Sequence, residues 1–297
     1  MAQTEHERAY LPSCWSKRWD SEQLLERYFK KCAEMTKEAR SSINCELDIP
    51  YGKSERTKYD IYGTNLPKDA PIFIFIHGGY WQEFTKDLSA FPASSLVSQG
   101  IKVIICGYDL CPNVSLTEIV SEIKIFLEKI LRDAHNSGSR KILIAGHSAG
   151  AHLAASVLHD NNWLNSMTEK GYRNLLKGLI LIAGVYDLKP LLTTSMNDAL
   201  QLTPEEIKLY SFAPIEKNDS LKESIIEDLK VIVTVGECDS PIFIEESKRY
   251  SQKLLKFVDQ VEFLLLRNNI DHFDIVENLV HCDFRLTKLI LQHFKSQ

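Results

Sequence analysis

The sequence has no paired cysteines and no metal-binding motif. Its seven cysteines form no C-x-x-C pair, and an odd number in a chain of 297 residues does not suggest a disulfide scaffold. There is no H-E-x-x-H sequence and no Walker-type glycine-rich loop. We therefore expect a protein without disulfides, bound metal or bound nucleotide.

Long apolar runs and an excess of positive charge are missing as well. Apolar stretches such as residues 72–76 and 179–185 are far shorter than the roughly 20 residues that span a bilayer. The polar N-terminus lacks the apolar region of a secretory signal. With 35 Lys and Arg against 40 Asp and Glu, the net charge of −5 argues against nucleic acid or an anionic membrane as a partner. These absences predict a soluble, intracellular protein.

Short apolar runs rich in Ile and Val alternate with longer helical patterns. This alternation is typical of an α/β protein with a mostly parallel sheet. The first two predicted strands alternate polar and apolar residues, as in a half-exposed antiparallel hairpin, whereas the later ones are nearly continuous apolar runs. Strands are predicted at about 44–49, 57–62, 72–76, 102–106, 141–145, 178–183, 230–235 and 260–266, and helices at about 20–39, 117–133, 149–159, 244–257 and 283–294.

One domain over residues 1–297 accounts for this pattern. Residues 186–225 contain no strand pattern and include Pro190, Pro204 and Pro214, with short helical pieces between them. An insertion of this kind after a strand is predicted to be a cap over a site rather than a second domain.

The segment Gly146-His147-Ser148-Ala149-Gly150 indicates a catalytic nucleophile. This G-x-S-x-G follows the apolar run KILIA and precedes the amphipathic run AHLAASVLH, which is the strand–turn–helix context of a nucleophile elbow. Small residues let strand and helix approach closely, and the helix N-terminus favours an anion beside Ser148. The alternative is a glycine-rich turn in which Ser148 only caps the helix.

An acid and a histidine follow two later strands. Asp239 comes just after the run KVIVTVG and His272 after VEFLLL, so both are expected at the edge of the sheet that carries Ser148. Asp239 is preferred over Glu237, which abuts the strand end. The prediction is thus Ser148 as nucleophile, His272 as base and Asp239 as the acid that orients it. The side chain of His147 is expected to point away from the nucleophile.

A second glycine-containing loop, His77-Gly78-Gly79, follows the apolar run IFIFI. Glycines there leave backbone N–H groups free to point into a cavity, as an oxyanion hole requires. We predict that the N–H groups of Gly78, Gly79 and Ala149 meet the oxyanion, and that His77 supports the loop structurally. The alternative is a plain Gly-Gly turn.

These motifs together resemble the kynurenine formamidases (arylformamidases), a branch of the α/β-hydrolase superfamily related to the hormone-sensitive-lipase-like esterases. The resemblance covers roughly residues 10 to 295. It is most specific at Tyr80, because most esterases of the neighbouring group have a third glycine there. The motifs that carry it are His77-Gly78-Gly79-Tyr80-Trp81, Tyr108-Asp109-Leu110-Cys111-Pro112, Gly146-His147-Ser148-Ala149-Gly150, Gly184-Val185-Tyr186-Asp187-Leu188, Gly236-Glu237-Cys238-Asp239 and Asp271-His272-Phe273.

The resemblance implies an α/β-hydrolase fold, with helices on both faces of a mostly parallel eight-stranded sheet and a small cap insertion. It also implies hydrolysis of N-formyl-L-kynurenine to L-kynurenine and formate, without a cofactor, in cytosolic tryptophan catabolism. Tyr80 and Trp81 are then predicted to line the pocket and stack on the substrate's ring. The alternative is that Trp81 packs in the core and Tyr80 only closes the loop.

Two other functions stay open on the sequence. A broad short-acyl aryl esterase would use the same triad, but Tyr80 and Trp81 in place of a third glycine argue against it. A non-catalytic, ligand-binding protein of the same fold would be expected to lose a triad member, whereas all three are present. The oligomeric state stays open, with a homodimer as one option.

Overall fold

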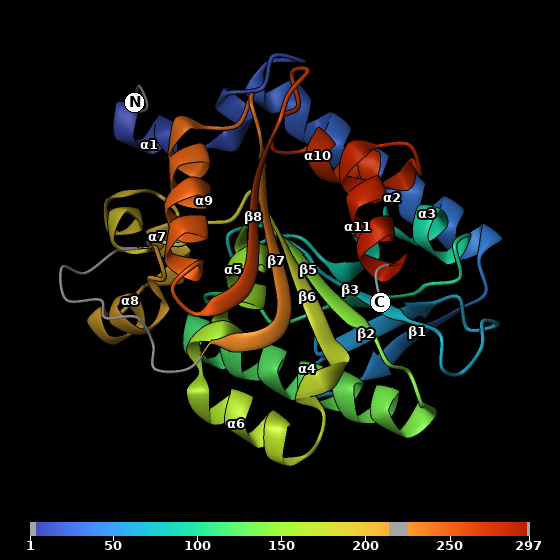
Figure 1. Ribbon diagram of the computed structural model, residues 1–297. Coiled ribbons are helices and arrows are strands. Elements are labelled where there is room, and N and C mark those ends of the chain that lie inside the picture. The colour runs from blue at the N-terminus through green and yellow to red at the C-terminus, as the bar shows by residue number, and fades with distance from the viewer. Residues whose placement is uncertain (1–3, 214–224, 296–297) are drawn as a thin grey trace.

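An eight-stranded sheet forms the centre of the computed structural model, which describes residues 4–213 and 225–295 (Figure 1). Its order is β1-β2-β4-β3-β5-β6-β7-β8. The pairs β1–β2 and β2–β4 are antiparallel and all other neighbours are parallel, which confirms the predicted mostly parallel sheet. The strands are β1 (Cys45–Pro50), β2 (Lys58–Tyr62), β3 (Ile72–Ile76), β4 (Lys102–Cys106), β5 (Ile142–His147), β6 (Leu176–Ile182), β7 (Ile226–Gly236) and β8 (Val258–Leu266).

The central strands are buried on both faces, as their apolar sequences predict. Every residue of β3 and β5 is buried, whereas β1 is exposed or half-exposed along its length. β7 begins at Ile226, four residues before its predicted start at 230. The difference arises because the chain bulges around Asp228, whose φ is 54°, and polar residues there interrupt the apolar run.

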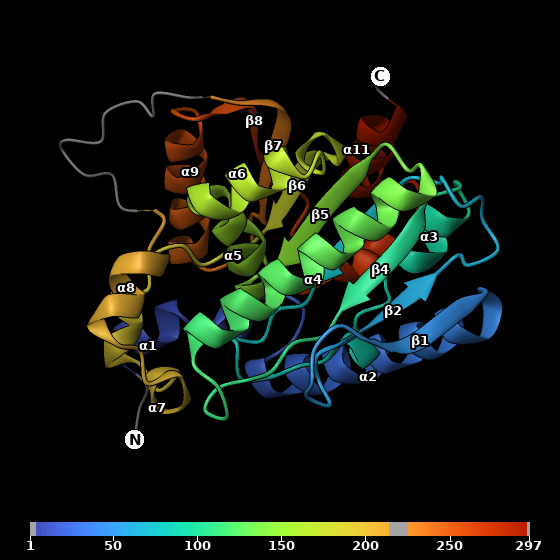
Figure 2. The same cartoon turned by 90° about the horizontal axis from the view of Figure 1, so that it is seen from below.

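Helices cover both faces of the sheet (Figures 1 and 2). One face carries α4 (Leu116–Ser137), α5 (Ala149–Ser156), α6 (Asn161–Glu169) and α9 (Pro241–Leu254), and the other carries α2 (Ser21–Ser42), α3 (Ala93–Val97) and α11 (Arg285–Lys295). Capping residues define both ends of α4. Ser115 and Glu118 form a capping box at its start, and Gly138 ends the helix in a left-handed conformation. Within residues 4–213 and 225–295, no helix has the length and apolar character needed to cross a membrane.

Two segments border the edge of the sheet at which the parallel strands end. One holds α1 (Glu5–Ala9) and η1 (Pro12–Cys14), and the other, within the predicted cap, holds η5 (Lys189–Thr193), α7 (Asn197–Leu200) and α8 (Pro204–Tyr210). They contact each other, since the N–H of Ser195 donates to the Glu7 carboxylate at 3.1 Å. Residues 214–224 of the predicted cap lie outside the described residues. The remaining short elements are η2 (Lys86–Leu88), η3 (Val157–His159), η4 (Arg173–Leu175), α10 (Asp274–Glu277) and η6 (Asn278–Val280).

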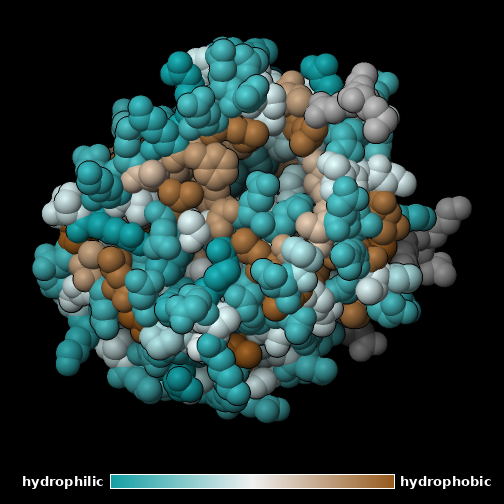
Figure 3. Space-filling model, turned by 180° about the vertical axis from the view of Figure 1, so that it is seen from behind, coloured by the Kyte–Doolittle hydropathy of each residue, from teal (hydrophilic) through white to brown (hydrophobic). Residues whose placement is uncertain are grey.

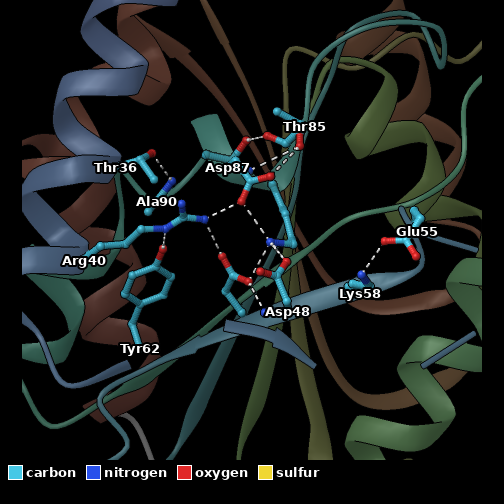
Figure 4. Close-up of polar contacts among 12 residues, drawn as sticks. Thr36, Arg40, Asp48, Glu55, Lys58, Tyr62, Thr85, Asp87 and Ala90 are labelled. Carbon is cyan, nitrogen blue, oxygen red and sulfur yellow. Dashed lines mark hydrogen bonds and ion pairs between the residues drawn. The ribbon is translucent and has the colours of Figure 1, made fainter. Parts of the chain in front are cut away.

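A buried ion network fastens the β1–β2 hairpin to α2 and to the loop after β3 (Figure 4). Asp60 of β2 is fully buried and accepts hydrogen bonds from Lys86 Nζ at 2.8 Å and from Arg40 Nη2 at 2.9 Å. Asp87 pairs with the same two cations. A buried carboxylate without such partners would be costly, so the network holds the chain just beyond the glycine loop in a defined place.

Candidate active site

Ser148 lies on a sharp turn between β5 and α5. Its φ of 54° is in the left-handed region, which non-glycine residues seldom adopt, as is typical of a nucleophile elbow. A Cβ on Gly146 would lie 2.1 Å from the carbonyl oxygen of Gly150, and a Cβ on Gly150 would lie 2.2 Å from that of Ile76. The two glycines are therefore required for the close approach of strand and helix that presents Ser148.

The predicted acid and base form a buried pair. Asp239 follows β7 and His272 follows β8, and His272 Nδ1 donates to Asp239 Oδ2 at 2.7 Å. The other carboxylate oxygen of Asp239 accepts the N–H of Ser240 at 2.7 Å. Glu237, the alternative acid, instead accepts from the N–H of Asn269. The structure thus brings Asp239, and not Glu237, to the histidine.

Ser148 and His272 line the same pocket, beside the Asp239 pair. In the described residues, no direct hydrogen bond joins the hydroxyl of Ser148 to the His272 ring. Catalytic hydrogen bonds of ligand-free sites often tighten only when the substrate is bound, so this geometry is compatible with a serine–histidine pair.

The glycine loop after β3 lies against the elbow. A Cβ on Gly78 would be 2.9 Å from both the carbonyl oxygen of His147 and Cβ of Ser148, so glycine permits this contact. Gly79 has a φ of 103°, which favours glycine. Within the described chain, the N–H groups of Gly78, Gly79 and Ala149 have no hydrogen-bond acceptor, which leaves them available to a ligand oxygen beside Ser148.

His77 holds the shape of this loop. It is buried, its Nδ1 donates to the carbonyl oxygen of Gly78 at 2.8 Å, and its ring stacks on Tyr108 at a centroid distance of 4.3 Å. The hydroxyl of Tyr108 donates to the carbonyl oxygen of His77 at 2.8 Å. Burial lowers the pKa of His77 to about 3, so the ring is neutral at physiological pH and is placed to support the loop.

His147 differs from the expectation that it points away from the nucleophile. It lines the pocket, and its Nε2 donates to the backbone carbonyl of His272 at 2.8 Å. Burial lowers the pKa of His147 well below its ordinary value, so the ring acts as a neutral donor. It therefore holds the loop that carries His272.

A cavity of about 330 Å³ opens at this edge of the sheet. Figure 3 shows a face of the molecule on which apolar side chains border a hollow. The lining combines the polar groups around Ser148 with an aromatic wall formed by Tyr28, Phe29, Phe84 and Phe273. In the part of the chain that the structure describes, no cluster of three or more His, Cys, Asp or Glu side chains is arranged to hold a metal ion.

Of the two aromatic residues after the glycine loop, Tyr80 lines the cavity and Trp81 is buried in the core. Tyr80 lines the cavity, and its hydroxyl donates to the carbonyl oxygen of Tyr10 at 2.6 Å. Trp81 is fully buried, and its ring packs edge-on against His152 at a centroid distance of 5.0 Å. The expected contact of Trp81 with a ligand is therefore corrected: its φ of 57° turns the chain here, and the indole packs in the core.

The N-terminal segment contributes pocket residues that the sequence interpretation missed. They are Leu11, Pro12, Ser13, Leu25, Tyr28 and Phe29, and the predicted cap adds Ser195 and Met196. A signal was present in α2, a largely polar helix on which Leu25 and Phe29 recur four residues apart and remain exposed. We call residues 11–29 the N-terminal wall.

Comparison with known proteins shows which family has this site. Residues 73–274 match the family model for the α/β hydrolase fold. A Silicibacter protein of known structure superposes with a TM-score of 0.76 at 25% identity, over 97% of this chain and 100% of that one. The kynurenine formamidase of Salmo salar is 36% identical over 98% of this chain and 96% of its own length, and that of Drosophila melanogaster 30% over 96% and 95%. The chain belongs to the kynurenine formamidase family.

Membership of the kynurenine formamidase family confirms the resemblance and the α/β-hydrolase fold that the motifs predicted. The match to the general hydrolase family begins at residue 73, so it does not include the N-terminal wall. The match to the Salmo salar kynurenine formamidase, by contrast, covers 98% of the chain. The match to the Silicibacter structure covers 97% of the chain, so the wall lies within both of these longer matches.

Proposed function

We propose that the protein is a serine hydrolase that cleaves N-formyl-L-kynurenine to L-kynurenine and formate. The observation that carries this proposal is the buried Asp239–His272 pair beside the strained Ser148, within a chain of the kynurenine formamidase family. The aromatic wall of the cavity supports an aryl substrate, since a flat ring packs favourably on such side chains. The cavity volume of about 330 Å³ suits a small molecule.

In the first half of the reaction, Ser148 Oγ attacks the formyl carbon while His272 Nε2 takes the hydroxyl proton. Asp239 accepts the Nδ1 proton of His272 in a hydrogen bond, which fixes the tautomer and stabilises the imidazolium. The negative charge on the formyl oxygen is met by the N–H groups of Gly78, Gly79 and Ala149. When the C–N bond breaks, His272 returns the proton to the departing arylamine.

In the second half, water hydrolyses the formyl-serine. His272 removes a proton from the attacking water, and the same three N–H groups meet the second oxyanion. The C–O bond to Ser148 breaks, the serine hydroxyl regains its proton from His272, and formic acid leaves and ionises to formate in water. Within the site, His272 carries each proton that is transferred.

The test compares kcat/KM on N-formyl-L-kynurenine with kcat/KM on 4-nitrophenyl acetate, for the wild type and Ser148→Ala. We expect a preference of several orders of magnitude for the formamide, with both activities lost in the variant because the nucleophile is gone. Comparable rates on the two substrates would indicate a broad aryl esterase instead. Turnover that survives in Ser148→Ala would overturn the serine mechanism.

Three expectations from the sequence stay predictions. We place the protein in the cytosol, which fluorescence microscopy of a tagged chain would test. A single domain predicts one cooperative unfolding transition by calorimetry. Light scattering would decide whether the chain forms a homodimer.

A further inference from the structure

The loop that carries His272 is held by a carboxylate that the mechanism does not use. Asp271, directly before His272, is fully buried. Its Oδ1 accepts the backbone N–H groups of Phe273 and Asp274, both at 2.9 Å. Hydrogen bonds of this local kind fix the main chain, here on the far side of His272. The position of the base therefore depends on the Asp271 carboxylate.

Arg18 of the N-terminal wall binds the same carboxylate with two nitrogens. Nε donates to Oδ2 of Asp271 at 2.8 Å, and Nη2 donates to Oδ1 at 3.0 Å. The Arg18 side chain is 21% exposed and that of Asp271 1%, so the pair is largely shielded from water. Burial tends to raise the pKa of Asp271, but the hydrogen bonds from Arg18 and Ser16 outweigh burial and leave this pKa lowered. Asp271 is therefore ionised and paired.

Neighbouring charges make Arg18 indispensable to this cluster. Glu277 Oε2 accepts from Arg18 Nη1 at 3.0 Å and from Lys31 Nζ at 2.7 Å. Burial, followed by the charge of Asp271, raises the pKa of Asp274 to about 7. Near neutral pH, Asp271 and Glu277 thus face two cations, while Asp274 is partly protonated. Loss of Arg18 would leave buried negative charge uncompensated, which is strongly unfavourable.

The N-terminal wall also touches both sides of the catalytic centre. The ring of Tyr28 contacts Phe273, the residue after His272, at a centroid distance of 4.9 Å. It also stacks on Phe84, in the chain that follows the oxyanion glycines, at 5.6 Å. Arg18 lies within the wall, between η1 and the first residue of α2. Its ion pair therefore fastens the wall to the histidine loop.

We propose that Arg18 is a positioning residue that couples the N-terminal wall to the catalytic base. The bidentate pair with Asp271 holds His272 where Nε2 can take the proton of Ser148. The pair requires that the wall be packed against the loop that carries His272. This proposal rests on the triad of the proposed function and not on the identity of the substrate.

Arg18→Gln tests the proposal, and Arg27→Gln, at a residue of the same segment that does not line the cavity, is its matched control. Both guanidinium groups lie over the ring of Trp19, at 5.1 and 4.9 Å from its centroid, but of the two it is Arg18 that pairs with Asp271. We expect Arg18→Gln to lower kcat about 10- to 100-fold on both the formamide and 4-nitrophenyl acetate, with a smaller change in KM, because slight misplacement of a catalytic group costs about this much. Arg27→Gln should keep kcat within about twofold of the wild type.

Two further variants separate positioning from folding. Arg18→Lys keeps the positive charge but loses the bidentate hydrogen bonds to Asp271. Its kcat should therefore lie between those of Arg18→Gln and the wild type. Asp271→Asn added to Arg18→Gln should cost little more than Arg18→Gln alone, because the pair is already broken. Thermal melting reports the folding of each variant. Two results would overturn the proposal: an Arg18→Gln variant with lowered Tm but kcat within about twofold of wild type, or losses that multiply in the double variant.

Labelling of Ser148 by a fluorophosphonate distinguishes this proposal from the substrate assignment. The probe needs a serine activated by its base but contains no formamide. If the formamide is not hydrolysed and Arg18→Gln still slows labelling, the substrate is wrong and the positioning role stands. Equal labelling rates in wild type and variant, or no labelling of the wild type, would contradict the role of Arg18.

Discussion

Gly78 lies where the glycine loop comes nearest to Ser148. A Cβ at this position would be 2.9 Å from the carbonyl oxygen of His147 and from Cβ of Ser148, so Gly78→Ala must push the loop away from the elbow. We expect the displaced N–H groups to lower kcat by about 10²- to 10³-fold, as removal of one oxyanion donor does. Steady-state kinetics measure the loss, and circular dichroism shows whether the variant remains folded.

Gly100→Ala is the matched control at the residue scale. Gly100 has a φ of 79°, which costs an alanine about 1 kcal/mol, but no atom lies within 4 Å of the added Cβ. This variant should lower Tm and leave kcat unchanged, whereas Gly78→Ala should lower kcat. An unchanged kcat in Gly78→Ala would remove Gly78 from the proposed oxyanion hole.

Residues placed by the local backbone could be predicted from the sequence. Ser148 was identifiable because G-x-S-x-G between an apolar strand and a helix specifies one kind of turn. Asp239 and His272 were identifiable because parallel strands end at one edge of the sheet. The contact of His147 with the His272 carbonyl joins positions 125 residues apart, and no local pattern reports such a contact.

At the scale of elements, α2 supplies an aromatic face to the cavity through Phe29. Its ring is 38% exposed and lies 5.4 Å from that of Phe84, between centroids. Phe29→Ala should raise KM for N-formyl-L-kynurenine about tenfold, because an aromatic contact with the substrate ring is worth about 1 kcal/mol or more. Tm should change little, since an exposed side chain contributes little to the core. Kinetics on the formamide, with a thermal melt, measure both.

Leu209→Ala provides the comparison for Phe29→Ala. Leu209 is an exposed apolar residue of α8 and does not line the cavity, so its removal should leave KM unchanged. Equal KM values for wild type and Phe29→Ala would show that the wall does not contact the substrate ring.

Helices with a strong local pattern were predicted closely, but the distant segments that they contact were not. α4 was recognised from its apolar stripe, and the structure extends it only to the capping box at Ser115 and to Gly138. α2 was also recognised as a helix, but its role as a wall depends on Arg18 reaching Asp271, more than 250 residues away in the sequence. The pairing of distant charges leaves no periodic signal, so the attachment of the wall to the loop of His272 could not be inferred from the sequence.

At the scale of the whole molecule, Glu246 joins α9 to the start of the predicted cap. Glu246 is only 5% exposed. Its Oε2 accepts the N–H groups of Tyr186 at 2.5 Å and Asp187 at 3.0 Å. Burial raises the pKa of Glu246 to about 7 from the ordinary 4.5. Between pH 4.5 and about pH 7, Glu246 is protonated in the folded chain but ionised in the unfolded chain. The free energy of unfolding contributed by Glu246 is therefore present below pH 4.5 and falls as pH rises through about 7.

Glu246→Gln removes this pH dependence. The amide oxygen can still accept both N–H groups, but there is no charge to bury at high pH. The variant's free energy of unfolding should therefore rise relative to the wild type by about 3 kcal/mol between pH 4 and pH 8, as measured by urea unfolding across that range. Glu245→Gln, at the exposed neighbouring position, should show no such pH-dependent difference. A constant difference between Glu246→Gln and the wild type would mean that the pKa of Glu246 is the same in the folded and the unfolded chain.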